Sequence, residues 1–389
     1  MKDVAWSTTR PSRLSSVDHD PAGDPPSVSA AQRQRTNGPR TNWDTTDMTT
    51  QQTDVDVVEA TARTGGASGL GGYGVLGVGM CLPDTIVSNA EIAADCGADV
   101  DWIERRIGVV ERRRLPSSDT VADMAATAGA QALDDASVRS GRSFQPGLLI
   151  VAVTGGDRVV PAPAFDVHAA LHFGLTPALS VDGACAGFAQ GMITGLSYSR
   201  AGFADTTLVI GANRAAFYAD RHDKRIAPLF GDGAGAFLLG PVPTGHGILA
   251  WQMFTHSELT SSLYTDRTIQ GSTAVEPLQM RGQEVANLFA TRLPAFIEQT
   301  LADAGLHIAD VDRLFVHQGN VRMVEGLASI LGLSPEQVPI SGRHVGNTAS
   351  ASLPIGVGMS ADELTSGDIV VLVTAGAGLN GAVVVMRWT

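Results

Sequence analysis

The sequence predicts a layered α/β fold built from two related halves. Strand-like and helix-like segments alternate from residue 73 to the end of the chain, which is typical of sheets covered by helices. Residues 147–153 form a continuous apolar run, as expected of a strand that is buried on both faces. Each half also has a strand that leads into a reactive side chain, Cys185 in the first and His317 in the second.

The first 66 residues differ in composition from the rest of the chain. They hold 17 Ser and Thr residues, one Leu, and no Ile or Phe. So little apolar surface cannot offset the entropy that ordering would cost. We therefore expect residues 1–66 to form a disordered tail, and Met48 is an alternative start of the chain.

In the first half, residues 67–243, the pattern predicts four helices, five strands and a loop. Residues 121–136 place Ala, Met and Leu on one helical face, and residues 186–201 are apolar on most sides, as in a buried helix. Residues 100–114 read as a short helix followed by an Arg-rich loop. The other expected elements are a helix over 163–173 and strands over 74–80, 147–153, 178–181, 206–211 and 233–239.

The second half, residues 244–389, repeats this alternation. A long helix is expected over 280–304, and two more over 321–331 and 349–363. Strands are expected over 313–316, 368–374 and 382–387, the last two joined by a Gly-rich turn.

Composition excludes several classes of function. A net charge of −13 argues against a nucleic-acid-binding protein. No run approaches 18 apolar residues, and the N-terminus has no apolar signal segment, so neither a membrane span nor secretion is expected. Three cysteines without metal-ligand spacing fit a reducing cytoplasm and predict no metal site.

Cys185 is the strongest candidate for chemistry. It lies where an apolar strand meets a helix rich in small residues, in the segment Asp-Gly-Ala-Cys-Ala-Gly-Phe (182–188). Backbone N–H groups and the dipole at a helix N-terminus favour a thiolate, which is the form that attacks thioesters. Taken alone, however, a Cys among Ala and Gly is more often a small buried apolar residue.

Two further segments place polar side chains at element boundaries. They are Phe-Val-His-Gln-Gly-Asn (315–320) and Val-Gly-Asn-Thr-Ala-Ser-Ala-Ser (345–352), which carry His317 and Asn347. Singly, each fits a structural role, because a His at a strand end or an Asn in a Gly loop is often turn or cap chemistry.

The full set of segments resembles the β-ketoacyl-acyl carrier protein synthase III family, a branch of the thiolase-like superfamily. The resemblance covers about residues 73–389. Four more stretches carry it: Asp-Trp-Ile-Glu-Arg-Arg-Ile-Gly (101–108), Leu-Phe-Gly-Asp-Gly-Ala-Gly-Ala (229–236), Met-Arg-Gly-Gln-Glu-Val (280–285) and Gly-Ala-Gly-Leu (376–379). It implies a thiolase-like fold whose two βαβαβ-type halves form five layers, α-β-α-β-α.

The resemblance also implies roles for individual residues. Cys185 would accept an acyl group, and His317 and Asn347 would donate hydrogen bonds to a malonyl thioester. The backbone N–H groups of Cys185 and Gly378 would form the oxyanion hole. The coenzyme A residues would be Trp102, Arg106 and Arg322, and the acyl gate would be Val160, whose small size would admit a bulky or branched acyl group.

The Gly-rich stretch 229–236 could be mistaken for a nucleotide-binding loop. That loop requires a GxGxxG pattern between a strand and a helix, whereas this stretch leads into an apolar strand. We therefore interpret it as a close-packed turn.

The resemblance implies acyl-coenzyme A and a malonyl thioester as substrates, no cofactor, and a homodimer. Two enzymatic hypotheses follow. One is decarboxylative condensation to a 3-oxoacyl product, and the other is acyl transfer to a hydroxyl or amine. A silent scaffold is a third hypothesis, which the presence of Cys185 opposes. Few basic residues follow His317, so the sequence leaves open whether the acceptor is malonyl carrier protein, malonyl-coenzyme A or another nucleophile.

Overall fold

The computed structural model describes residues 72–158, 160–266 and 276–389. All of them belong to one compact unit. The predicted tail, residues 1–66, lies outside the described residues. The expected boundary between the halves, at residues 243–244, falls in the turn between strands β7 and β8.

The first half contains a five-stranded sheet in the order β1-β7-β6-β4-β5. Strands β4, β5 and β6 run parallel, and β7 is antiparallel to both β6 and β1. The bounds are β1 Gly72–Cys81, β4 Leu148–Ala152, β5 Ala178–Val181, β6 Thr207–Arg214 and β7 Asp232–Val242.

The second half contains a four-stranded sheet in the order β11-β12-β13-β8. Strand β11 is parallel to β12, and β13 is antiparallel to both β12 and β8. The directions of β8, β13, β12 and β11 therefore repeat those of β1, β7, β6 and β4, which confirms that the halves are related. The bounds are β8 Gly247–Thr255, β11 Arg313–Val316, β12 Ile369–Gly376 and β13 Asn380–Arg387.

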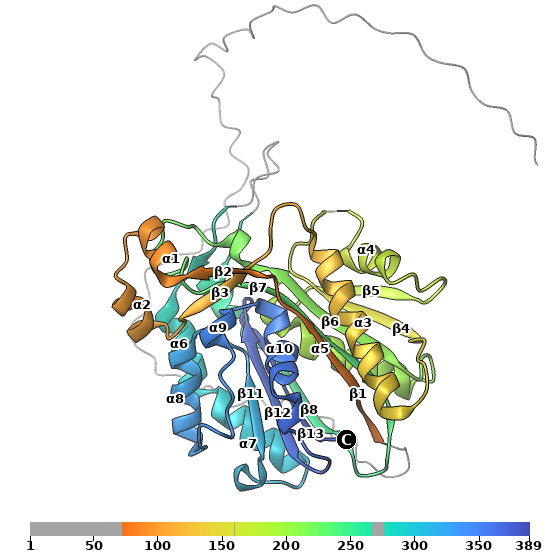
Figure 1. Ribbon diagram of the computed structural model, residues 1–389. Helices are drawn as coiled ribbons and strands as arrows, with labels where there is room; N and C mark the ends of the chain where they lie inside the picture. Colours follow the sequence, from red (N-terminus) through yellow and green to blue (C-terminus); the bar gives the residue numbers. More distant parts are fainter. Residues whose placement is uncertain (1–71, 159, 267–275) are drawn as a thin grey trace, which may run out of the picture. The chain divides into compact units, whose positions relative to one another are not determined.

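Helices cover both faces of both sheets and give the five expected layers (Figure 1). Helices α5 and α10 lie between the sheets, α3 and α4 cover the outer face of the first sheet, and α7 and α8 cover that of the second. The bounds are α3 Val121–Ser140, α4 Pro163–Ala170, α5 Gly187–Arg200, α7 Leu293–Asp303, α8 Val321–Leu331 and α10 Ser352–Met359.

Alternation along the strands explains why the layers form. In β4, Leu148 and Ile150 pack into the central layer with α5, whereas Leu149 and Val151 pack outward against α3 and α4. Successive side chains point to opposite faces of a strand, so an unbroken apolar run buries both faces at once. None of the described helices combines the length and the apolarity needed to cross a membrane.

Smaller elements complete the described part of the chain. Strands β2 and β3 pair with each other, as do β9 and β10, and the short helix α9 precedes Asn347. The bounds are β2 Thr85–Ser88, α1 Asn89–Cys96, α2 Val100–Arg106, β3 Glu111–Arg114, β9 Leu263–Tyr264, β10 Gln279–Met280, α6 Gly282–Thr291 and α9 Gly342–Val345.

Three sequence-based expectations were wrong in detail. The Arg-rich loop ends in strand β3, because residues 111–114 pair with β2 and bury Arg112 completely. The long helix 280–304 breaks at Arg292, and Pro294, which has no N–H to donate, lies in the first turn of α7. Residues 349–363 divide into α10 and two flanking 3₁₀ turns, the first of which contains Ala349 at φ +52°.

Close packing of β1 on α3 gives a test of the fold. A Cβ at Gly79 would lie 2.2 Å from the carbonyl oxygen of Ala128, so we predict that Gly79→Ala lowers the free energy of unfolding by about 1–3 kcal/mol. The matched control is Gly326→Ala in α8, where a Cβ meets nothing within 4 Å. That change should raise the free energy of unfolding by roughly 0.5–1 kcal/mol. Urea denaturation measures both, and equal effects of the two changes would contradict this packing.

Candidate active site

A cavity of about 310 Å³ brings Cys185, His317 and Asn347 together. These residues come from three separate parts of the chain and from both halves, and all three line the same cavity. The rest of the lining is mostly apolar and comes largely from the region around α6, β9 and β10. The apolar lining includes Leu229, Phe230, Leu263, Leu278, Met280, Val285, Leu288, Phe289, Met323 and Leu379.

Cys185 sits in a tight turn between β5 and α5. The preceding residue, Ala184, has φ +48°, a left-handed conformation that costs energy for a residue with a Cβ. The turn is held by the second half of the chain. Thr374 Oγ1 at the end of β12 donates to the carbonyl oxygen of Cys185 at 2.9 Å. A Cβ at Gly376 would lie 2.7 Å from Cys185 Cβ, so only glycine lets β12 approach this closely.

Burial changes the acidity of the Cys185 thiol. The side chain is half-buried in the cavity wall, and desolvation raises its pKa to about 12, against a smaller lowering by its own backbone N–H. The raised pKa runs against the expectation of a favoured thiolate at this turn. The thiol proton must leave as the sulfur attacks.

His317 follows the end of β11 and is held as a neutral imidazole. Its backbone N–H donates to Val373 at 2.8 Å, and only 2 % of its surface is exposed. Desolvation lowers the pKa of His317 to about 4. Its Nδ1 has no hydrogen-bond partner among the described residues. A Cβ at Gly319 would lie 3.2 Å from Nε2, so glycine at this position leaves that nitrogen accessible.

Asn347 is fixed by two sets of hydrogen bonds. Its backbone pairs with the other half, because its N–H donates to the carbonyl of Leu229 at 2.8 Å and its carbonyl accepts from Gly231 at 3.0 Å. Its side-chain Oδ1 accepts the backbone N–H of Ala349 at 2.9 Å. Since Oδ1 is engaged, the amide presents Nδ2, a donor, to the cavity.

The Gly-rich stretch beside Asn347 is closely packed, but the expected turn is wrong, because residues 232–236 already belong to strand β7. A Cβ at Gly231 would lie 2.0 Å from the carbonyl oxygen of Val345. The Asp232 carboxylate is fully buried and accepts the backbone N–H groups of Leu115 at 2.8 Å and Ala216 at 3.1 Å. Burial raises the pKa of Asp232. This carboxylate ties three segments of the chain together.

A second polar pair near the cavity was missed in the sequence. Asn213 Nδ2 donates to Ser350 Oγ at 2.6 Å, and Ser350 Oγ donates to the carbonyl of Ala152 at 2.7 Å. Ser350 occupies in the second half the position that Cys185 has in the first, since each lies in a 3₁₀ turn before a central helix. The partners are 137 and 198 residues apart, so no local pattern could indicate them.

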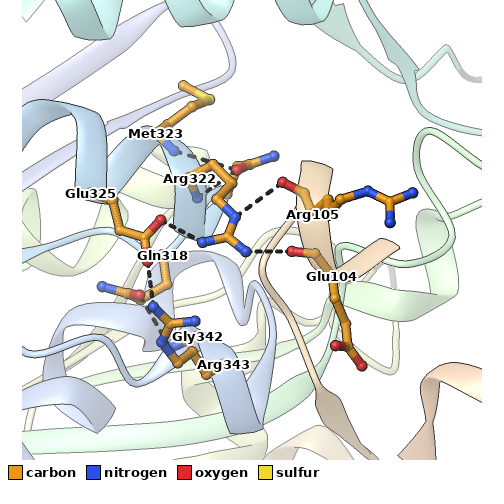
Figure 2. A network of polar contacts seen from close by, with 9 residues as sticks. Glu104, Arg105, Gln318, Arg322, Met323, Glu325, Gly342 and Arg343 are labelled. Carbon is orange, nitrogen blue, oxygen red and sulfur yellow. Dashed lines mark hydrogen bonds and ion pairs between the residues drawn. The ribbon is translucent and has the colours of Figure 1, made fainter. Parts of the chain in front are cut away.

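Arg322 is fully engaged within the protein (Figure 2). Its Nη2 donates to the carbonyl of Glu104 at 2.6 Å and its Nε to that of Arg105 at 3.1 Å. These carbonyls belong to the last turn of α2, where a cation is favourable. Nη1 pairs with Glu325 at 2.8 Å, and Glu325 also binds Arg343. A role of Arg322 toward coenzyme A stays a prediction.

The other predicted binding residues lie outside the cavity lining formed by the described residues. Trp102 is half-buried on α2, and Arg106 is exposed at the C-terminal end of that helix. Lys224, whose Nζ lies 5.9 Å from the centre of the Trp102 ring, was not predicted as a binding residue. Only two lysines occur in the chain, and that rarity was the one available signal.

Gly378 and Val160 are placed differently. Gly378 has φ +118° in the turn between β12 and β13, and its neighbours Ala377 and Leu379 line the cavity. Thr260 Oγ1 donates to the Gly378 carbonyl at 3.0 Å, which leaves the oxyanion role of the Gly378 N–H a prediction. Val160 is 82 % exposed and does not line the cavity, so its role as an acyl gate also stays a prediction.

Comparison with known families finds two matching models. Residues 179–257 match 3-oxoacyl-[acyl-carrier-protein] synthase III, and residues 301–388 match the C-terminal model of the same enzyme. A similar protein is β-ketoacyl-[acyl-carrier-protein] synthase III 1 of Bacillus anthracis, 32 % identical over 81 % of this chain and 98 % of its own length. Synthase III 2 of Streptomyces coelicolor is 36 % identical over 82 % and 95 %.

Solved structures give the same result. The synthase III of Aquifex aeolicus superposes with a TM-score of 0.76 and 28 % identity, over 82 % of this chain and all of that one. The priming β-ketosynthase of the R1128 polyketide pathway also has a TM-score of 0.76, with 26 % identity over 82 % of this chain and 96 % of its own.

The pKa of His317 can be tested directly. With its pKa near 4, the imidazole stays neutral throughout the range in which an ordinary His titrates, about pH 5.5 to 8. We predict that the NMR signals of the ¹⁵N-labelled His317 ring do not move across that range. The variant His317→Asn identifies the signals by their loss. An inflection near pH 6.5 would contradict the burial described above.

Proposed function

The chain belongs to the 3-oxoacyl-[acyl-carrier-protein] synthase III family, and on that premise we propose that it joins an acyl group to a malonyl thioester with loss of carbon dioxide. The observation that carries the proposal is the donor pair in the cavity. The neutral imidazole of His317 and the amide of Asn347, whose oxygen is already hydrogen-bonded, line the same cavity as the Cys185 thiol. The relatives and the solved neighbours bear the names of condensing enzymes, one of them a priming ketosynthase of a polyketide pathway.

In the first step, the Cys185 sulfur attacks the carbonyl carbon of an acyl-coenzyme A. The bond from that carbon to the coenzyme A sulfur breaks, and the new bond to Cys185 replaces it. The thiol proton ends on the departing coenzyme A sulfur. We assign the oxyanion of the tetrahedral intermediate to the backbone N–H groups of Cys185 and Gly378, since the tight turns at both residues line or flank the cavity.

In the second step, a malonyl thioester replaces coenzyme A. His317 Nε2 and Asn347 Nδ2 donate to its carbonyl oxygen while the carbon–carbon bond to the carboxylate breaks. Carbon dioxide leaves, and the electron pair remains on the enolate. Donors aimed at such developing charge contribute about 3–4 kcal/mol each. The enolate carbon attacks the acyl-Cys185 carbonyl, the carbon–sulfur bond breaks, and the 3-oxoacyl thioester and the Cys185 thiolate result. The thiolate then takes up a proton from water and returns to the thiol.

The electrostatics of the cavity suit the second step. Carboxylates are absent from its lining among the described residues, so no anion on its walls opposes the enolate. The low dielectric of an apolar lining strengthens hydrogen bonds to a developing charge. A simple acyltransferase would need a base for its hydroxyl or amine acceptor, and a His317 whose pKa lies near 4 is a poor base at neutral pH.

The substrates suggest further features of the proposal. The apolar lining fits an acyl chain and the pantetheine arm of the thioester. Trp102 offers a ring face for adenine, and Lys224 beside it offers a positive charge for the nucleotide phosphates. No bound cofactor is needed, because the thioester itself supplies the activated carbonyl. In a homodimer, the segment that starts at Val160 would contribute to the partner's acyl pocket.

Acylation and decarboxylation can be measured separately. The protein is incubated with a panel of acyl-coenzyme A esters, and its intact mass is recorded. We predict a gain of one acyl group on the wild type and on Cys96→Ala, and no gain on Cys185→Ala. Added malonyl-coenzyme A or malonyl carrier protein should then release carbon dioxide and return the mass to that of the free protein.

Each failure has a distinct meaning. A wild-type protein that gains no mass on Cys185 would overturn the acyl-cysteine. Loading that persists after malonyl thioester is added, without carbon dioxide, would overturn condensation and support simple acyl transfer.

A further inference from the structure

Arg112 is a fully buried cation that the proposed steps do not use. It lies on β3 with none of its surface exposed, and it is the largest fully buried side chain among the described residues. None of its hydrogen bonds goes to a carboxylate among the described residues, and its Nε has no partner among them. Burial lowers the pKa of Arg112 to about 10. A buried charge of this kind is costly, and an apolar side chain would fill the same space without that cost.

The guanidinium joins segments that lie far apart in the sequence. Nη1 donates to the carbonyl of Val87 at 3.2 Å, and Nη2 donates to Asn89 Oδ1 at 2.8 Å and to the carbonyl of Pro228 at 2.9 Å. Asn89 Nδ2 in turn donates to the carbonyl of Val109 at 2.8 Å. The planar fork of an Arg can hold three acceptors in fixed directions, which no other side chain can do.

The Pro228 contact leads directly to Asn347. Pro228 is followed by Leu229 and Gly231, the two residues whose backbone pairs with that of Asn347. The aliphatic stem of Arg112 packs against this pair of backbone segments. A Cβ on Gly231 or on Gly346 would each lie 3.2 Å from Arg112 Cβ. The Arg112 stem therefore packs against the paired segments at Gly231 and Gly346, and its guanidinium fixes the carbonyl of Pro228 just before them.

We propose that Arg112 is a positioning residue for the decarboxylation step, because it holds the segment from Pro228 to Gly231 on which the Asn347 amide is registered. The inference rests on the proposed function. It separates the acylation step from the decarboxylation step, since the Cys185 turn is held by Thr374 and Gly376 of β12. The hydrogen bonds of Arg112 to described residues go to Val87, Asn89 and Pro228 instead. Loss of the fork should therefore displace the donor for the malonyl carbonyl and leave the nucleophile in place.

The test compares the two half-reactions in matched variants. Arg112→Met keeps the length of the side chain and removes the fork, and Arg112→Lys keeps the charge. Arg113→Met is the control, since Arg113 lies next on β3 and, among the described residues, donates a hydrogen bond to the carbonyl of Pro83 at 3.3 Å and to no segment that holds Asn347. Acylation of Cys185 is followed by intact mass, and release of carbon dioxide by a labelled malonyl-coenzyme A. Each Arg112 variant is also made in an Asn347→Ala background.

We expect Arg112→Met to acylate at a rate within about twofold of wild type and to release carbon dioxide about tenfold or more slowly, because small displacements of a catalytic group are costly. In the Asn347→Ala background it should cause no further loss, since the residue that it positions is already gone. Arg112→Lys should retain acylation and show a smaller loss of decarboxylation. Arg113→Met should match wild type in both.

Equal reductions in the rates of acylation and decarboxylation in Arg112→Met would overturn the inference. It would also be overturned if Arg112→Met slowed decarboxylation as much in the Asn347→Ala background as in the wild type. If Arg112→Met does not fold, Arg112→Lys decides: wild-type decarboxylation there would overturn the role of the fork, and a selective loss would support it. A wild-type protein that neither acylates nor releases carbon dioxide would instead refute the proposed function itself.

Discussion

Each reactive turn of the protein is held by the other half of the molecule. The Cys185 turn of the first half accepts a hydrogen bond from Thr374 and packs on Gly376, at the end of a strand in the second half. The Asn347 turn of the second half pairs with Leu229 and Gly231 of the first. The site therefore exists only when the two sheets and the helices between them are packed. The buried core between the sheets, not any local motif, fixes the distance between nucleophile and donors.

The same packing sets the chemistry. Because the cavity is lined mostly by apolar side chains, desolvation raises the pKa of the Cys185 thiol and lowers that of the His317 imidazole, which keeps both groups neutral. A neutral site with two inward donors is poorly suited to removing protons and well suited to stabilising a charge that appears during reaction. Two of the polar groups that support it are satisfied by backbone N–H groups: Asn347 Oδ1 by that of Ala349, and the Asp232 carboxylate by those of Leu115 and Ala216. Their positions are consequently fixed before a substrate arrives.

The sequence was informative where the physical signal is local. The strands at 178–181 and 313–316 and the helix at 321–331 have the predicted bounds, because short apolar runs with sharp polar ends leave little choice. Cys185, His317 and Asn347 could be selected because their segments together resemble the motifs of one enzyme family, although each residue alone fits a structural role. The break at Arg292, the burial of Arg112 and the pairing of Asn213 with Ser350 could not be predicted. They depend on partners more than a hundred residues away or on the exact approach of two elements. The raised pKa of Cys185 was missed for the same reason, since burial is a property of the folded cavity.

The central claim is that Asn347 acts through its Nδ2 donor while its oxygen is held by the Ala349 N–H. The substitution Asn347→Asp tests it most directly, because it keeps the size of the side chain and the acceptor for Ala349 but replaces the donor with an anion. The measurement is the rate of carbon dioxide release from malonyl-coenzyme A after Cys185 has been acylated. The account predicts normal acylation and a loss of decarboxylation of about a hundredfold or more. Decarboxylation within a few-fold of wild type would contradict it.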